Sequence, residues 1–85
     1  MDNIIAEYRT SDTTLSAFLI ISQFTLLYID YSHARFDFAF PLSDEIKAAS
    51  THYLSGNALI EPSSFTRIHR KLLRLIRKQC QWEED

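Results

Sequence analysis

Hydrophobic and polar residues alternate most regularly between residues 24 and 40. The segment from Phe24 to Tyr31 has the period of a strand, and the segment from Arg35 to Phe40 alternates strictly, with its three phenylalanines on one face. Only residues 32–34 separate the two segments, which is short enough for a hairpin turn. The pattern therefore predicts a β-hairpin whose phenylalanine face belongs to the core.

Before this hairpin, the sequence predicts a short strand and a buried helix. The segment from Ile4 to Arg9 is short and partly β-prone. Thr10, Ser11 and Asp12 then offer three candidate N-cap side chains before an apolar stretch. We expect a helix from Asp12 or Thr13 to about Ser22. Because apolar residues occupy most of its circumference, this helix should be largely buried.

After the hairpin, the sequence predicts a second helix with one apolar stripe. Pro41 ends the preceding strand, and Ser43 or Asp44 can cap the helix that follows. The stripe has the i, i+3, i+7 spacing in Ile46, Ala49 and Tyr53. Gly56 is the only glycine of the chain, and it is the expected stop because glycine adopts a left-handed backbone without a Cβ clash.

The last third of the chain predicts a short strand and a long helix. Residues 58–61 are a candidate for the strand. Pro62, followed by two serines, is a typical helix start, and we expect the helix to run to about Gln79. The acidic tail, Glu83 to Asp85, should lie beyond the helix.

The predicted order of elements is β-α-β-β-α-β-α, which makes the chain a single α+β domain over residues 1–85. With 85 residues, of which 46% are hydrophobic, the chain is near the lower size at which one core is stable without disulfides or metals. With four strands, the order is that of the split βαβ, ferredoxin-like motif followed by an extra helix. Because the first strand, the first helix and the last strand are short for that fold, a three-stranded sheet is the alternative, and the N-terminal strand decides between them.

The last predicted helix is amphipathic, with a basic side opposite an apolar side. At 100° per residue, five apolar residues cluster together: Phe65, Ile68, Leu72, Leu75 and Ile76. The opposite third of the helix carries six of the nine basic residues of the chain: Arg67, Arg70, Lys71, Arg74, Arg77 and Lys78. No acidic residue lies between Glu61 and Glu83, so the basic side lacks the carboxylates at i, i+4 that usually accompany exposed cations.

The sequence leaves three interpretations of this basic side open. It is a plain solvated surface, since Lys and Arg are good helix formers. It binds the phosphates of a nucleic acid while the apolar side docks on the sheet, since closely spaced cations gain from counterion release. Or it contacts an acidic protein surface. The uncompensated repulsion among like charges favours a binding role, and we place nucleic acid first. We expect the acidic tail to screen this side only weakly.

The charge of the chain is segregated, which keeps a protein-interaction role as the alternative. Residues 1–61 carry three bases and eight acids, or −5, whereas residues 62–85 carry six bases and three acids, or +3. Opposite ends of two copies can therefore attract each other, so a homo-oligomer or a subunit of a larger complex fits this pattern. Exposed parts of Tyr28, Tyr31 or Trp82 are the candidate contact surface.

The side chains able to support catalysis or bind a metal are few and scattered. They are His33, His52, His69 and Cys80, without a Gly-rich phosphate loop, an HExxH motif or a cysteine pair. We expect His69 to pack half-buried on the apolar side of its helix. We therefore expect a protein that is not an enzyme and has no cofactor and no metal site.

The remaining features favour a cytoplasmic protein without a membrane partner. The single Cys80 excludes an internal disulfide and fits a reducing compartment. Asp2 stands where a secretory signal carries positive charge, and the apolar run from Leu15 to Ile21 is too short to span a bilayer. The apolar side of the last helix is needed for the core of so small a domain, which argues against membrane binding.

Two stretches of the chain resemble an uncharacterised family of short proteins. Thr10-Ser11-Asp12 precedes the first helix, and Gly56-Asn57-Ala58-Leu59 leads through Pro62 to the basic helix. With the aromatic hairpin between them, these stretches are similar to a domain of unknown function from bacterial, viral and mobile-element genomes, over residues 8 to 76. The chain departs from it in having Ser22-Gln23-Phe24 where those proteins place a glycine. The resemblance implies a small α+β domain in a nucleic-acid-associated setting, and it supplies no activity and no site residue.

Overall fold

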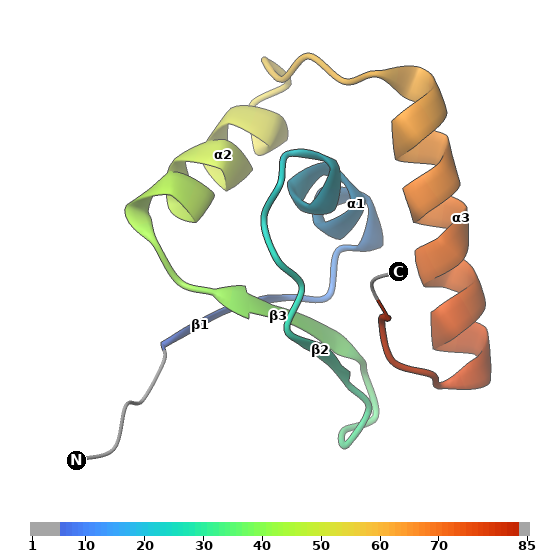
Figure 1. Ribbon diagram of the computed structural model, residues 1–85. Helices are drawn as coiled ribbons and strands as arrows, with labels where there is room; N and C mark the ends of the chain where they lie inside the picture. Colours follow the sequence, from blue (N-terminus) through green and yellow to red (C-terminus); the bar gives the residue numbers. More distant parts are fainter. Residues whose placement is uncertain (1–5, 84–85) are drawn as a thin grey trace.

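The computed structural model describes residues 6–83 and shows an α+β protein with a three-stranded sheet and three helices (Figure 1). The strands are β1 (Glu7–Thr10), β2 (Tyr28–Asp30) and β3 (Asp37–Pro41). The helices are α1 (Thr13–Ile21), α2 (Asp44–Leu54) and α3 (Pro62–Lys78). The prediction of a small α+β fold that ends in a basic helix is confirmed.

The sheet is antiparallel, with β3 in the centre and β1 and β2 at its edges. Arg9 of β1 and Tyr28 of β2 lie opposite Ala39, one on each side of it. The N-terminal strand therefore joins the sheet, although its first predicted residues, Ile4 and Ile5, lie outside the described residues. Because β1 and β2 flank β3 and α1 connects them, this arrangement is a split βαβ unit.

The predicted fourth strand, residues 58–61, is not formed. The four-stranded, ferredoxin-like arrangement was therefore wrong, and the three-stranded alternative is confirmed. The prediction that the N-terminal strand decides between them was also wrong, because β1 is in the sheet and the missing last strand makes the difference. Figure 1 shows this segment crossing from the end of α2 to the start of α3, on the side of the helices away from the sheet. Ala58 and Ile60 pack against the core there, and Glu61 caps α3. Because residues 58–61 connect α2 to α3 on this side of the helices, they cannot also pair with an edge of the sheet.

The predicted hairpin is present, but its strands are shorter and its turn is longer than predicted. Gln23 has a left-handed backbone, with φ of 77°, that turns the chain after α1, and residues 24–27 then form a loop. Strand pairing then stops where Asp30 lies opposite Asp37. Residues 31–36 consequently form the turn.

α1 and α2 begin at predicted capping residues, and α2 is followed by the predicted glycine. The Asp12 carboxylate accepts a hydrogen bond of 3.1 Å from the Leu15 amide, and the Ser43 hydroxyl accepts one of 3.1 Å from the Ile46 amide. Gly56 follows α2 with φ of 82°, a backbone conformation that residues with a Cβ rarely adopt. Local sequence signals were therefore sufficient to predict where α1 and α2 begin and where α2 stops.

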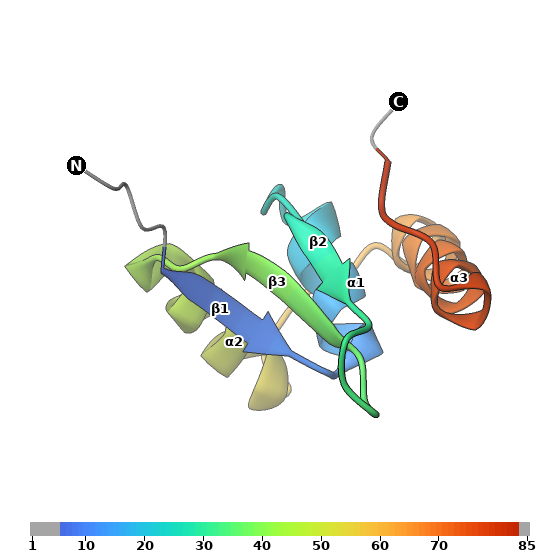
Figure 2. The same cartoon turned by 90° about the horizontal axis from the view of Figure 1, so that it is seen from below.

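One face of the sheet carries the core, and within residues 6–83 no helix covers the other face, which we call the open face (Figure 2). Figure 2 looks from the open side, with the strands in front and α1 and α2 behind them. On the covered face, Phe38, Phe40 and Ile29 are at most 1% exposed, which confirms the predicted phenylalanine core. Phe36 is only half-buried and lies edge-on to Phe38, with ring centroids 5.4 Å apart. α3 lies beside α1 rather than over the sheet (Figures 1 and 2).

Candidate functional site

α3 carries the candidate site and is fixed by caps at both ends. The Glu61 carboxylate accepts a hydrogen bond from the Ser64 amide, which lowers the pKa of that carboxyl. Pro62 is the first helical residue, where its missing N–H costs no hydrogen bond. Gln79 ends the helix in a left-handed backbone, with φ of 54°. Glutamate is an uncommon N-cap, so only its place before Pro62 could have signalled its role.

The apolar side of α3 packs mainly against α1. Leu72 is fully buried and Ile68 is 7% exposed, while Phe65, Leu75 and Ile76 are half-buried against the core. The predicted docking of this side is confirmed, but its partner is α1 and not the sheet, because α3 lies beside the helical layer. The opposite side of α3 therefore forms an outer edge of the molecule (Figures 1 and 2).

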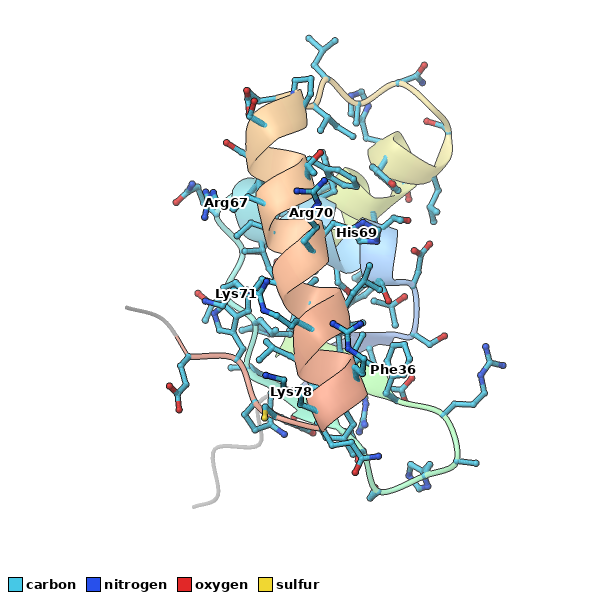
Figure 3. All side chains as sticks on the ribbon, turned by 90° about the vertical axis from the view of Figure 1, so that its right-hand side faces the viewer. Phe36, Arg67, His69, Arg70, Lys71 and Lys78 are labelled. Carbon is cyan, nitrogen blue, oxygen red and sulfur yellow. The ribbon has the colours of Figure 1, made fainter. Side chains whose placement is uncertain are left out.

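Five of the six predicted binding residues are exposed on this outer side. They are Arg67, Arg70, Arg74, Arg77 and Lys78, and we call them the basic face. Among residues 6–83, no carboxylate oxygen lies within 4.0 Å of their charged nitrogens. Figure 3 shows Arg67 on one flank of α3 and Arg70 on the other. The structure thus brings together, on one helix surface, cations that have no carboxylate partner in the described part of the chain.

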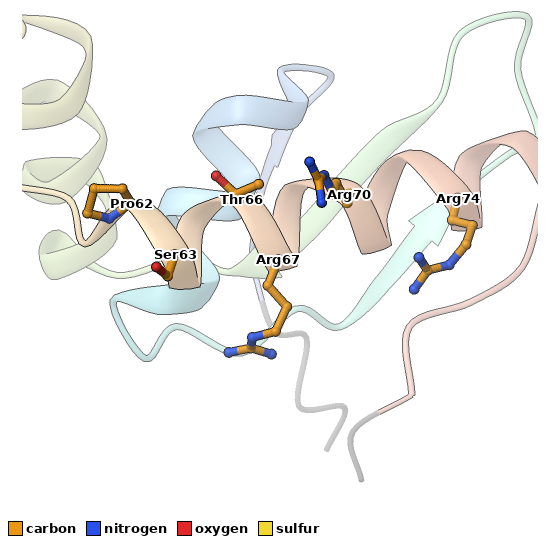
Figure 4. A pocket seen from close by; sticks show the side chains of 6 residues that line it. All are labelled: Pro62, Ser63, Thr66, Arg67, Arg70 and Arg74. Atoms are coloured by element: carbon orange, nitrogen blue, oxygen red, sulfur yellow. The ribbon is translucent and has the colours of Figure 1, made fainter.

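A shallow hollow borders the first half of the basic face (Figure 4). Its lining consists of Pro62, Ser63, Thr66, Arg67, Arg70 and Arg74. In Figure 4, the Arg67 side chain extends toward one side of the helix and the Arg70 side chain toward the other. Because the hollow is open to solvent and bordered by guanidinium groups, it suits an extended or rod-like anion better than an enclosed small molecule.

Lys71 is the exception among the six, because the C-terminal segment, residues 79–83, folds back beside it. The Lys71 ammonium lies 4.3 Å from the centre of the Trp82 ring and donates a hydrogen bond of 3.3 Å to the Glu83 carbonyl oxygen. The Glu83 carboxylate makes no ion pair with α3 within the described residues, and Glu84 and Asp85 lie outside them. The sixth predicted cation is therefore held by the chain itself.

The C-terminal segment also closes one edge of the sheet, through contacts that no local pattern signals. The Gln81 side-chain amide donates to the Ile29 carbonyl oxygen and accepts from the Ile29 amide, at 2.7 Å in both cases. The Tyr31 hydroxyl lies 3.1 Å from the Leu75 carbonyl oxygen and 2.6 Å from that of Cys80. These bonds hold the end of α3 against β2 and so fix the direction in which the basic face points.

Four other residues singled out in the sequence make structural contacts, namely Tyr28, Tyr31, His69 and Trp82. The Tyr28 hydroxyl donates to the Glu7 carboxylate at 2.9 Å, so Tyr28, like Tyr31 and Trp82, is engaged within the chain. His69 is half-buried, as predicted, and it stacks on Phe65, with ring centroids 5.7 Å apart. Within residues 6–83, no cluster of three or more His, Cys, Asp or Glu side chains is placed to hold a metal ion. Over the same residues, no helix has the length and apolar character needed to cross a membrane.

Comparison with known proteins does not identify a family for this chain. No protein-family model matches it, and neither a curated protein nor a solved structure does so. The resemblance to a domain of unknown function therefore stays a prediction. Function is consequently inferred from the geometry and charge of the chain itself, and above all from the basic face.

Proposed function

We propose that the protein is a small, non-enzymatic binding module that contacts nucleic acid through the basic face of α3. The observation that carries this proposal is the set of five outward cations without a carboxylate neighbour within the described residues. Like charges at i, i+3 and i+4 repel one another in the unbound helix. Phosphates that neutralise these charges relieve the repulsion and release condensed counterions, and both effects favour binding.

The chemistry of the basic face also suits phosphate. Four of its five residues are arginines, whose planar guanidinium groups donate two parallel hydrogen bonds to phosphate oxygens. The hydroxyls of Ser63 and Thr66 line the same hollow and add neutral donors of the kind that contact nucleic acid backbones. Because α3 is held by its caps and by Gln81, only the long side chains must become ordered on binding.

The proposal is tested by the binding of a fluorescently labelled oligonucleotide, followed by anisotropy between about 50 and 200 mM KCl. The test variant is Arg70→Gln/Arg74→Gln, which removes two cations from the centre of the basic face. If each contributes one phosphate contact, we expect the affinity at about 50 mM salt to fall roughly a hundredfold. The log–log salt slope should decrease in magnitude by about 1.4 to 1.8.

A matched control removes two exposed cations outside α3, in the variant Arg35→Gln/Lys47→Gln. This variant has the same net charge as the test variant, so long-range attraction changes equally in the two. We expect its affinity to stay within about threefold of the wild type, because distant charges are largely screened. The proposal is wrong if the wild type binds neither DNA nor RNA at low salt, or if both variants weaken binding equally.

A protein-interaction role is the second candidate, and two exposed leucines favour it. Leu59 is 98% exposed and Leu54 is 64% exposed, and both lie near the connection between α2 and α3. Large apolar side chains left in water suit contact with a second copy or with a larger complex. Neither leucine belongs to the basic face, so the two candidate functions use different residues.

A further inference from the structure

The basic face consists of two rows of cations that run along opposite flanks of α3. At 100° per residue, Arg67 and Lys78 lie on one flank, and Arg70 and Arg77 lie about 80° away on the other. By the same spacing, the backbone of Arg74 lies between the two rows. Figure 4 shows the Arg67 and Arg70 side chains extending to opposite sides of the helix, and the Arg74 side chain extending to the same side as that of Arg67.

The dimensions of this arrangement match the major groove of duplex DNA. An α-helix with its side chains is about 10–12 Å across, and the major groove of B-DNA is about 12 Å wide. From Arg67 to Lys78 the rise along the helix is about 16 Å, which corresponds to roughly five base pairs. A helix in the groove has one phosphate backbone on each flank, so each row of cations meets its own strand.

Other nucleic acids fit the two rows less well. A single strand offers one line of phosphates and would leave one row without a partner. Duplex RNA offers two backbones, but its major groove is too deep and narrow to admit side chains in this way. In this protein α3 forms an outer edge and is attached through its apolar side, so the basic face can enter a groove ahead of the other elements (Figures 1 and 2).

We infer that the ligand of the basic face is double-stranded DNA and that α3 binds in its major groove. Arg67 and Lys78 contact one phosphate backbone, and Arg70 and Arg77 contact the other. The Arg74 side chain extends to the side of Arg67 in Figure 4, so it contacts the same backbone as Arg67 and Lys78. This inference rests on the proposed nucleic-acid function and narrows the class of its ligand.

Two double variants, each lacking one row, test the inference. They are Arg67→Gln/Lys78→Gln and Arg70→Gln/Arg77→Gln, and glutamine maintains the helix in both. On a DNA duplex, we expect each variant to lose roughly a hundredfold in affinity at about 50 mM salt and about 1.8 units of salt slope. The wild type should bind the duplex about tenfold or more tighter than its separated strands or an RNA duplex of the same sequence.

The outcomes separate this inference from the function on which it rests. If only one row contributes, or if single strands or duplex RNA bind as tightly as duplex DNA, groove binding is wrong and nucleic-acid binding stands. If the wild type binds no nucleic acid at all, the proposed function itself fails. The Arg35→Gln/Lys47→Gln variant again controls for net charge. Circular dichroism confirms that each variant is folded before it is compared.

Discussion

Arginine has two opposite settings in this protein, which Arg9 on the sheet and Arg74 on α3 illustrate. Arg9 lies on the open face of the sheet, where it bonds with the Asp30 carboxylate and lies 3.7 Å from Asp37 and 3.8 Å from Glu7. Arg74 lies on the basic face, where no carboxylate of the described residues comes within 4.0 Å. The first guanidinium is neutralised by its own chain, and the second is not.

This difference teaches that the neighbours of an arginine indicate its role here better than its exposure does. The carboxylates around Arg9 come from β1, β2 and β3, so the network ties the three strands together on the uncovered face. The charge of Arg74 is instead repelled by its helical neighbours, which leaves it available to an external anion. Lys71 is intermediate, because an aromatic ring and a backbone carbonyl hold it without neutralising it.

We expect the largest effect from a carboxylate placed beside the basic face, because an arginine of α3 then acquires the kind of partner that Arg9 has on the sheet. Thr66 is exposed one turn before Arg70, so in Thr66→Glu the new carboxylate meets that guanidinium at i, i+4 in the favourable orientation. We expect nucleic-acid affinity at about 50 mM salt to fall more than about tenfold. The free energy of unfolding should rise by about 0.3–0.5 kcal/mol. Anisotropy and chemical denaturation measure the two changes.

The control for this variant is Thr66→Gln, which has a similar size and no charge. It should leave the free energy of unfolding close to its wild-type value. It should lower the affinity far less than Thr66→Glu does, because it exchanges the neutral hydroxyl donor for a neutral amide donor. If Thr66→Gln weakens binding as much as Thr66→Glu does, the Thr66 hydroxyl and not the charge of Arg70 is responsible. The contrast between neutralised and available arginines would then lose its support on α3.

The basic face could be predicted from the sequence because all of its signals are local. The period of α3 repeats over 17 residues, and the absence of acids between Glu61 and Glu83 is visible without any fold. The network around Arg9 could not be predicted, because it joins residues 21 apart and requires the register that places Arg9 and Tyr28 on either side of Ala39. No periodicity along the chain encodes that register.

The C-terminal segment and residues 58–61, where a fourth strand was predicted, also show that local sequence patterns do not predict long-range contacts. Gln81 and Ile29 are 52 residues apart, and a single glutamine carries no signal that it will pair with the edge of a sheet. Residues 58–61 have the short apolar character of a strand, but Ala58 and Ile60 bury their side chains without strand pairing. Local patterns therefore predicted which segments are apolar, while long-range packing decided how they are used.

The contrast can also be tested by making a cation available instead of neutralising one. Lys71 is now held by the Trp82 ring and the Glu83 carbonyl oxygen, and removal of the ring should release it. In Trp82→Leu an apolar side chain remains, but the ring face that attracts the ammonium is lost. We expect the free energy of unfolding to fall by at least about 0.5–1 kcal/mol. The salt slope should steepen by up to about 0.9, with a severalfold gain in affinity, as Lys71 becomes a further phosphate contact. Adding Lys71→Gln to this variant should remove the gain, and an unchanged slope in Trp82→Leu would show that Lys71 was already available.

The smallest expected effect is on the pH dependence of the free energy of unfolding, to which the setting of Arg9 should contribute and the setting of Arg74 should not. The pKa of Asp30 lies well below its usual range, because the Ser32 hydroxyl and amide donate hydrogen bonds to it and Arg9 bonds with it. Such a carboxylate stabilises the fold above its unfolded-state pKa of about 4 and loses that contribution as the pH falls further. We therefore expect the free energy of unfolding to fall between about pH 5 and pH 2, with a smaller slope in Asp30→Asn. Because guanidinium groups do not titrate in this range, Arg74→Gln should keep the wild-type slope. Equal slopes in Asp30→Asn and the wild type would contradict the contrast, since the charge of Asp30 would then have no part in holding the sheet.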